Sequence, residues 1–196
     1  MMAQSAEYSS MEPFGGGGTI EIRALKPDDT ADMLAAIDRT SMQSRQRRFF
    51  APKRGFSDNE IAFFMNIDFV NHVALVAQIN HNGHSEIVAG GRYVVVKPGQ
   101  AEVAFVVIDA YQGQGLGKAL MRHLIRLARS AGLKELVAEV LSDNQAMRRV
   151  LSNAGFTLVS RERSASFAFF TGAHVNGGLP TVHKVYETSS RPARRP

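Results

Sequence analysis

Apolar residues recur along this chain with two periods, which predict an alternation of strands and helices over residues 19–171. Alternating or continuous apolar runs predict strands, at residues 19–25, 73–79, 87–96, 103–108, 136–141, 156–160 and 166–171. Apolar positions three and four residues apart predict helices, which begin at Pro27, Ser57, Leu116 and Asp143. Gly90 and Gly91 interrupt one strand and indicate a bulge or the close approach of another backbone. A length of 196 residues suits a single domain.

The two ends of the chain lack this periodicity. Residues 1–18 are polar and end in four consecutive glycines, so we expect a flexible N-terminal arm outside the core. Residues 172–196 are rich in Gly, Pro and polar residues and end in several arginines, so we expect an irregular, basic C-terminal tail. Much of the net charge of +5 lies in this tail. The body of the protein is therefore not basic enough to indicate a nucleic-acid partner.

Composition excludes several other classes. Hydrophobic residues make up 44% of the chain and charged residues 21%, as in globular proteins. The absence of cysteine excludes disulfides, thiol nucleophiles and thiolate metal sites. No membrane span or secretory signal is visible, so we expect a cytoplasmic protein without a membrane partner. His81 and His84 have no third ligand at a sensible spacing, and we interpret them as exposed turn residues rather than a metal site.

Residues 101–118 carry the strongest chemical pattern in the chain. An apolar strand leads into Gly113, Gly115 and Gly117, and a helix follows at once. Unpaired N–H groups at a helix N-terminus favour an anion, and glycines let the backbone approach it closely. The P-loop spacing fails because Ala119 follows Lys118, and the dinucleotide fingerprint fails because it needs glycine at position 118. The sequence therefore predicts a phosphate-binding loop of another kind.

Gln112, Gly115 and Gly117 fit the pattern Gln/Arg-x-x-Gly-x-Gly/Ala, and Asn144 is followed by Gly155-Phe156. In this order the two motifs resemble the GNAT N-acetyltransferase superfamily. The resemblance covers roughly residues 19–171. It implies a single α/β (α+β) domain with a mixed, mostly antiparallel twisted sheet that is splayed at the central strand and has helices on both faces.

The segment Ser41-x-x-Ser44-Arg45-x-x-Arg48-Phe49-Phe50 is similar to one found in Pat-type protein lysine acetyltransferases, a GNAT subgroup. In GNAT folds this region lines the acceptor side of the cleft. Solvated arginines beside two core phenylalanines are the alternative interpretation.

The resemblance implies acetyl-CoA as cosubstrate and no metal. Backbone groups of the glycine loop would hold the pyrophosphate, the end of the central strand would run beside the pantetheine, and an asparagine would bind from the neighbouring strand end. The implied cofactor-binding residues are Phe105, Val106, Val107, Gln112, Gly113, Gln114, Gly115, Leu116, Gly117, Lys118 and Asn144.

An amine acceptor requires a general base, because a lysine amine is protonated at neutral pH. Glu102 is the first candidate: it resembles the Pat-type catalytic glutamate, and its apolar strand neighbours should raise its pKa. Glu139 is the second candidate. Some other GNAT subgroups resemble this chain in having a glutamate five residues before the asparagine. Where many GNAT enzymes have a tyrosine that protonates the leaving thiolate, this chain has Leu151, and Pat-type members resemble it in lacking that tyrosine.

These features predict an N-acetyltransferase that moves an acetyl group from acetyl-CoA to a primary amine, foremost a protein lysine side chain. The alternatives are acetylation of a small amine, such as a polyamine or aminoglycoside, and a non-catalytic acyl-CoA-binding sensor. A monomer or a homodimer fits the sequence equally well.

Overall fold

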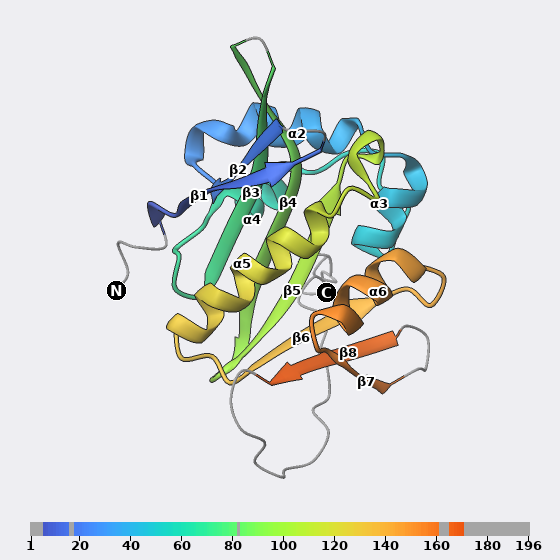
Figure 1. Ribbon diagram of the computed structural model, residues 1–196. Coiled ribbons are helices and arrows are strands. Elements are labelled where there is room, and N and C mark those ends of the chain that lie inside the picture. The colour runs from blue at the N-terminus through green and yellow to red at the C-terminus, as the bar shows by residue number, and fades with distance from the viewer. Residues whose placement is uncertain (1–5, 16–17, 82, 161–164, 171–196) are drawn as a thin grey trace, which may run out of the picture.

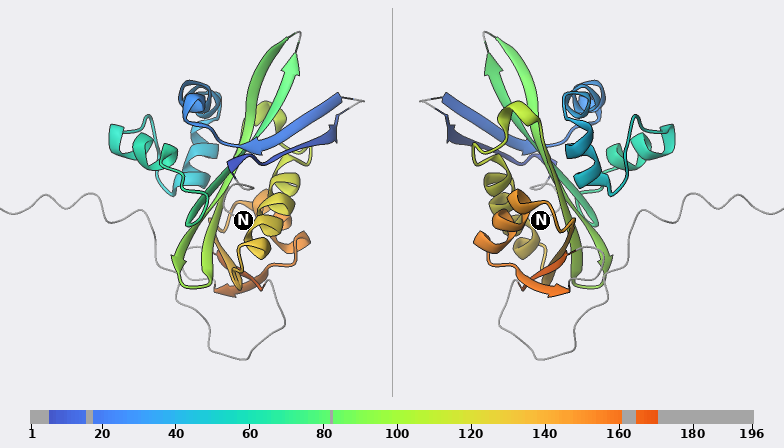
Figure 2. Two further views of the ribbon diagram at one scale, coloured as in Figure 1. Left: turned by 90° about the vertical axis from the view of Figure 1, so that its left-hand side faces the viewer. Right: turned by 90° about the vertical axis from the view of Figure 1, so that its right-hand side faces the viewer.

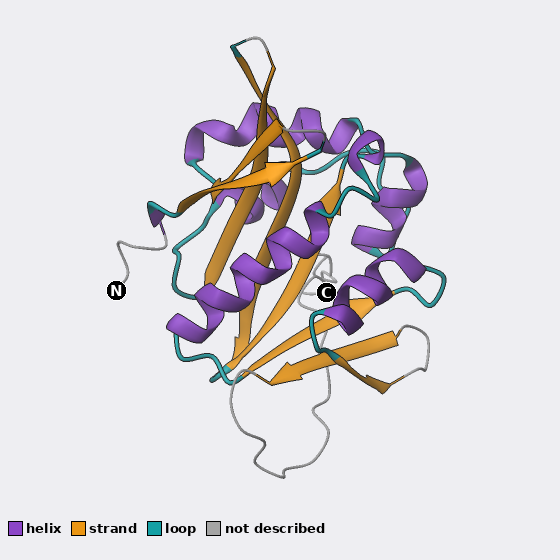
Figure 3. Cartoon of the chain, in the orientation of Figure 1, coloured by secondary structure: helices purple, strands orange, loops and turns teal. Residues whose placement is uncertain are grey.

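The computed structural model contains one twisted sheet with helices on both faces (Figure 1; Figure 3). It describes residues 6–15, 18–81, 83–160 and 165–170. In chain order the strands are β1 (Ser9–Phe14), β2 (Gly18–Ala24), β3 (His72–His81), β4 (His84–Lys97), β5 (Gln100–Val107), β6 (Glu135–Val140), β7 (Thr157–Ser160) and β8 (Ala165–Phe170). The helices are η1 (Pro27–Asp29), α2 (Thr30–Asp38), α3 (Met42–Phe49), α4 (Asp58–Met65), η2 (Asp109–Tyr111), α5 (Leu116–Ser130) and α6 (Gln145–Asn153). The predicted tail, 172–196, lies outside the described residues.

The strands are arranged in the order β1-β2-β3-β4-β5-β6-β8-β7. All neighbours are antiparallel except β5 and β6, which are parallel. These two strands pair at only three positions, where residues 100–102 face residues 135–137. Beyond this point they diverge, as Figure 1 shows. The predicted mixed sheet with a splay at its central strand is confirmed.

Helices cover both faces of the sheet. Figure 2 shows α2, α3 and α4 on one face and α5 and α6 on the other. Helix α5 turns Leu120, Leu124 and Ala128 toward the sheet with no exposed area, while Arg122 and Arg126 lie exposed. Such an apolar stripe holds a helix on a sheet because burying it removes apolar surface from water. The central strands are accordingly buried on both faces.

The expectation that residues 1–18 form a flexible arm is wrong for the part that the structure describes. β1 pairs with β2 at six positions, and Gly18 N donates to Gly15 O at 2.8 Å. Side chains also fix β1 to α5: Glu12 contacts Arg122 and accepts at 2.6 Å from the ring of His123, and Tyr8 contacts the same ring. The polar strand is therefore held by backbone pairing and ionic contacts, which hydrophobic periodicity does not detect.

Gly91 accommodates a side chain rather than another backbone. It faces Phe105 across the β4–β5 ladder, and a Cβ at Gly91 would lie 2.8 Å from two ring atoms of Phe105 and 3.2 Å from Cδ1 of Leu124. At Gly90 the nearest contacts of an added Cβ would be 3.7 Å and 3.8 Å, which is ordinary packing. Only Gly91 is therefore required for close packing of β5 against α5.

We predict that Gly91→Ala lowers the free energy of unfolding by about 1–3 kcal/mol, because the new methyl group overpacks the core against Phe105. The matched control Gly90→Ala should leave stability unchanged or raise it slightly, since it restricts the unfolded chain without a clash. Urea denaturation of both variants measures the difference. Equal stabilities would contradict the packing role of Gly91.

Candidate active site

The divergence of β5 and β6 opens a cleft of about 370 Å³. Helix α3 contributes to one wall and α6 to another, and the loop between η2 and α5 lies at the end of β5. The volume is within the range of small-molecule and cofactor sites, roughly 300–1,000 Å³. Of the residues predicted as site residues, only Gln114 is not among those that line this cleft.

The glycine loop presents free backbone donors to the cleft. Gly113 and Gly115 have φ angles of 75° and 90°, which other residues adopt only with strain. Within the described chain, the N–H groups from Gly113 through Lys118 donate to no acceptor. A Cβ added at Gly113 or Gly115 would meet nothing within 4 Å, so the space beside the loop is open. Free N–H groups at the start of a 15-residue helix suit a phosphate group.

The glutamine side chains of the loop brace it from within. Nε2 of Gln112 lies 3.1 Å from Val107 O and 3.0 Å from Ser44 Oγ, which links the loop to the end of β5 and to α3. Nε2 of Gln114 donates to Ala110 O at 3.0 Å and faces away from the lining of the cleft. The loop therefore offers its backbone to a ligand, while these side chains hold its shape.

Asn144 caps helix α6, which begins at Gln145 and not at Asp143 as the sequence predicted. Oδ1 of Asn144 accepts from Met147 N at 3.2 Å, which satisfies one of the free N–H groups of the first turn. Asp143 lies outside the helix and contacts Arg47 Nη2 at 3.4 Å instead. Asn144 still lines the cleft. Within the described chain its side-chain NH₂ makes no hydrogen bond, so it can donate to a ligand.

Two carboxylates face the cleft from its opposite strands. Glu102 stands on β5 and Glu139 on β6, and Arg48 of α3 lines the same cleft. Burial raises the pKa of Glu102 to about 7, an effect that the positive charge of Arg48 opposes and the negative charge of Glu139 reinforces. A carboxylate that titrates near neutral pH is suited to act as a general base.

Helix α3 and the residue after it contribute several side chains to the cleft. Ser44, Arg47, Arg48 and Phe50 line the cleft, and Nε of Arg47 is buried without an acceptor in the described chain. Arg45 does not line it: its guanidinium donates to Asp38 O at 3.0 Å and to Thr40 O at 3.2 Å. The expectation that this segment lines the cleft therefore does not extend to Arg45.

Several lining residues had no place in the sequence prediction. They are Tyr111, Ala146, Arg149 and Val150. Helical spacing after Asn144 is the signal that could have found the residues of α6. Leu151 is fully buried and lines the cleft without any group that could donate a proton.

A sequence model of the Acetyltransferase (GNAT) family matches residues 39–156, which span the cleft from α3 to the end of α6. The chain belongs to this family. An acetyltransferase of Pseudomonas aeruginosa is 33% identical over 147 residues, which are 74% of this chain and 79% of that protein. The acetyltransferase Pat of Mycolicibacterium smegmatis is 30% identical over 148 residues, 72% of this chain, but this chain spans only 42% of that protein.

A solved structure supports the assignment to the Pat-type subgroup. The GNAT domain of S. lividans PAT is 32% identical and superposes with a TM-score of 0.76, covering 83% of this chain and 96% of that domain. The protein is therefore a Pat-like GNAT acetyltransferase, and acetyl-CoA is its acyl donor. The cleft fits this donor: the loop N–H groups and the buried Nε of Arg47 are donors without acceptors, as phosphate groups require.

The described residues lack two other features. No helix there is both long and apolar enough to cross a membrane. The same part of the chain holds no cluster of three or more His, Asp or Glu side chains that could bind a metal ion.

We predict that Gly115→Leu weakens acetyl-CoA binding at least 100-fold, because a side chain would occupy the space where the loop meets a phosphate. Isothermal calorimetry measures the dissociation constant, and thermal denaturation separately measures the backbone strain of leucine at a φ of 90°. The matched control Gln114→Ala, in the same loop, should bind within about threefold of wild type, since that side chain faces away from the cleft. Unchanged affinity in a folded Gly115→Leu variant would refute the loop as the phosphate site.

Proposed function

We propose that this acetyltransferase transfers the acetyl group to the ε-amino group of a protein lysine, with Glu102 as the general base. The position of Glu102 carries the proposal: it lies in the cleft beside the glycine loop, and burial raises its pKa to about 7. Such a group is largely ionised at slightly alkaline pH, yet basic enough to accept a proton from an ammonium group. The likeness to proteins named Pat supports a protein acceptor.

Different residues of the cleft would have different roles in acyl transfer. The N–H groups from Gly113 to Lys118 would hold the pyrophosphate, residues 105–107 would flank the pantetheine, and the side-chain NH₂ of Asn144 would donate to the cofactor. An inward N–H of β5 would polarise the thioester carbonyl. Bound acetyl-CoA supplies this carbonyl, and its carbon–sulfur bond breaks as the carbon–nitrogen bond forms.

Glu102 removes the proton that prevents attack. An acceptor lysine has a pKa of about 10.4, so its amine enters the cleft protonated. The carboxylate of Glu102 takes one proton from this ammonium group, and the amine nitrogen gives up a second proton to solvent after it attacks the carbonyl. The departing thiolate takes a proton from solvent, because Leu151 cannot donate one and a thiol with a pKa of about 8.5 is a tolerable leaving group. Glu139 is the second candidate for the base, since it lines the same cleft.

The charge of the cleft favours a protein acceptor over a small polycation. Arg47 and Arg48 line the wall formed by α3, and Lys118 and Arg149 lie elsewhere on the lining. Cationic groups repel polyamines and aminoglycosides, whereas they complement acidic residues around a target lysine. A small amine substrate and an acyl-CoA sensor without turnover remain the alternative functions. For the location of the enzyme we propose the cytoplasm, and for its assembly a monomer or homodimer.

We predict that Glu102→Gln lowers kcat/KM by about 10²–10⁴, the usual contribution of a general base. In the wild type, kcat/KM should fall about tenfold per pH unit below pH 7, because Glu102 becomes protonated there and can no longer accept a proton. Initial rates of CoA release from pH 5.5 to 9 measure both effects. Glu139→Gln is the matched control: it should keep the acid limb and shift it to lower pH, since it removes a negative charge that raises the pKa of Glu102. If Glu139→Gln loses activity and Glu102→Gln does not, the base is Glu139.

We predict that the enzyme releases CoA faster with lysine peptides that have acidic flanking residues than with the same peptides in which these residues are neutral, by about fivefold or more. Mass spectrometry of the products identifies the acetylated amine. Spermidine and an aminoglycoside serve as comparison acceptors. Faster turnover with either would support the small-molecule alternative, and acetyl-CoA binding without turnover on any acceptor would support the sensor.

A further inference from the structure

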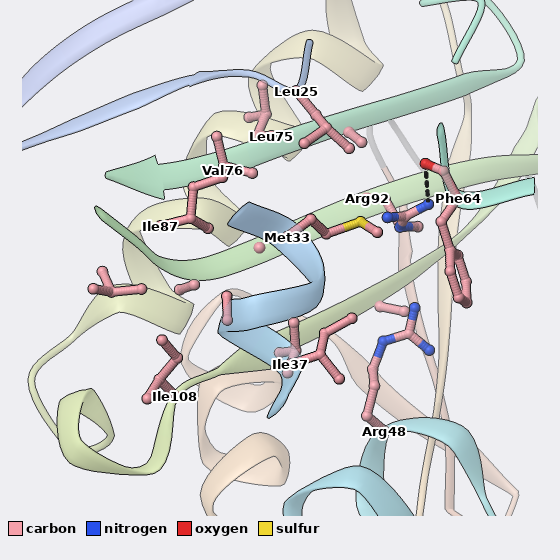
Figure 4. A pocket seen from close by; sticks show the side chains of 18 of the residues that line it. Leu25, Met33, Ile37, Arg48, Phe64, Leu75, Val76, Ile87, Arg92 and Ile108 are labelled. Atoms are coloured by element: carbon pink, nitrogen blue, oxygen red, sulfur yellow. Dashed lines mark hydrogen bonds between the residues drawn. The ribbon is translucent and has the colours of Figure 1, made fainter. Parts of the chain in front are cut away.

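A second cavity, of about 50 Å³, lies on the face of the sheet that α2 covers (Figure 4). Figure 4 shows Met33 and Ile37 of α2 between Ile87 and Ile108 at one end and Arg48 and Arg92 at the other. Small residues in its lining help to leave it open; they are Ala36, Ala74, Gly90 and Ala104. About two molecules of liquid water occupy this volume. The cavity therefore has room for about two methylene groups.

The cavity adjoins the cleft along the middle of β5. Ala104, Val106 and Arg48 line both spaces. Because side chains alternate along a strand, Ala104 and Val106 share the face of Glu102. The cavity therefore begins next to the general base, where the acyl end of the donor would lie if its pantetheine runs along residues 105–107.

The charges in the lining indicate which reacting group could occupy the cavity, the acceptor amine or the acyl group of the donor. Arg48 and Arg92 are the charged side chains in its lining. Arg92 donates to Phe64 O at 3.1 Å and lies 3.0 Å from Nε2 of His72, whose pKa burial and the charge of Arg92 lower to about 4. The local charge is therefore positive, which disfavours a protonated amine and leaves a neutral, apolar group as the suitable occupant.

We propose that this cavity is an acyl-chain pocket that admits donors with about two carbons more than acetyl, such as propionyl-CoA and butyryl-CoA. The inference rests on the proposed placement of the donor in the cleft. The chemistry is unchanged by the longer chain. The carbon–nitrogen bond forms and the carbon–sulfur bond breaks, Glu102 takes one proton from the ammonium group, the nitrogen loses a second proton to solvent, and the departing thiolate takes a proton from solvent. The extra methylenes gain affinity by leaving water for an apolar cavity.

Calorimetric titration with acetyl-, butyryl- and hexanoyl-CoA, without any acceptor, tests the pocket. Each buried methylene tightens binding by about fourfold, so we expect the dissociation constant of butyryl-CoA to be roughly tenfold below that of acetyl-CoA. Hexanoyl-CoA should lose this advantage because two further carbons exceed the cavity. Equal affinity for acetyl- and butyryl-CoA would overturn the proposal. Failure of every acyl-CoA to bind would instead refute the placement of the donor in the cleft.

Two neighbouring alanines of α2 supply matched variants. Ala36 is 8% exposed and lines the cavity, whereas Ala35 is exposed on the other side of the helix. Ala36→Leu should fill the pocket and abolish the preference for butyryl-CoA, with acetyl-CoA affinity unchanged, and Ala35→Leu should behave as wild type. An unchanged preference in folded Ala36→Leu would place the acyl chain elsewhere and overturn the proposal.

Ile37→Ala provides a second test in the opposite direction. It removes a side chain that is 5% exposed and lines the cavity, so affinity for hexanoyl-CoA should rise at least fivefold. No gain would count against the pocket. Tighter binding of succinyl-CoA than of butyryl-CoA to the wild type would also overturn it, by showing that the two arginines select a carboxylate.

Discussion

The pairing of β5 with β6 stops after three positions, and the rest of the site depends on this interruption. Past Glu102, the edge of β5 that faces β6 no longer has a strand partner, although its other edge remains paired with β4. Unpaired backbone groups away from water are costly unless they find another partner. A cofactor arm that contains amides can take the place of the missing strand. Helices α3 and α6 line the gap, and the contact between Arg47 and Asp143 joins α3 to the turn that precedes α6.

The same geometry sets the protonation of Glu102, the proposed base. Glu102 lies at the last paired position and lines the cleft, where burial removes water from its carboxylate. Burial raises the pKa and Arg48 opposes the rise, so the group titrates near pH 7 instead of remaining protonated. An arginine on α3 thus has an electrostatic effect on a strand to which it does not belong. The position of helix α3 and the protonation of the proposed base are therefore coupled.

Local spacing made much of this predictable. The glycine loop, Asn144 and Glu102 are recognisable because each needs a certain residue type at a fixed distance along the chain, and the structure brings all three to one cleft. Contacts between distant segments were not predictable. β1 is polar, and its place depends on α5 more than 100 residues later. Arg45 and Arg48 look alike in sequence, and only tertiary packing turns one toward backbone carbonyls and the other toward the cleft.

The second cavity could not be predicted from the sequence for a further reason. A cavity forms only where several small side chains, distant in the sequence, together fail to fill the space between them. Protein interiors are packed closely, and an empty volume of 50 Å³ costs about 1 kcal/mol of stability. A leucine at Ala36 adds three carbons, enough to fill a space of about two methylene groups, and alanine and leucine have similar helix propensities. The cavity is compatible with a stable fold at this cost, but a ligand that fills it recovers the lost contacts. Because Ala104 and Val106 line both the cavity and the cleft, the acyl donor proposed for the cleft is the ligand best placed to do so.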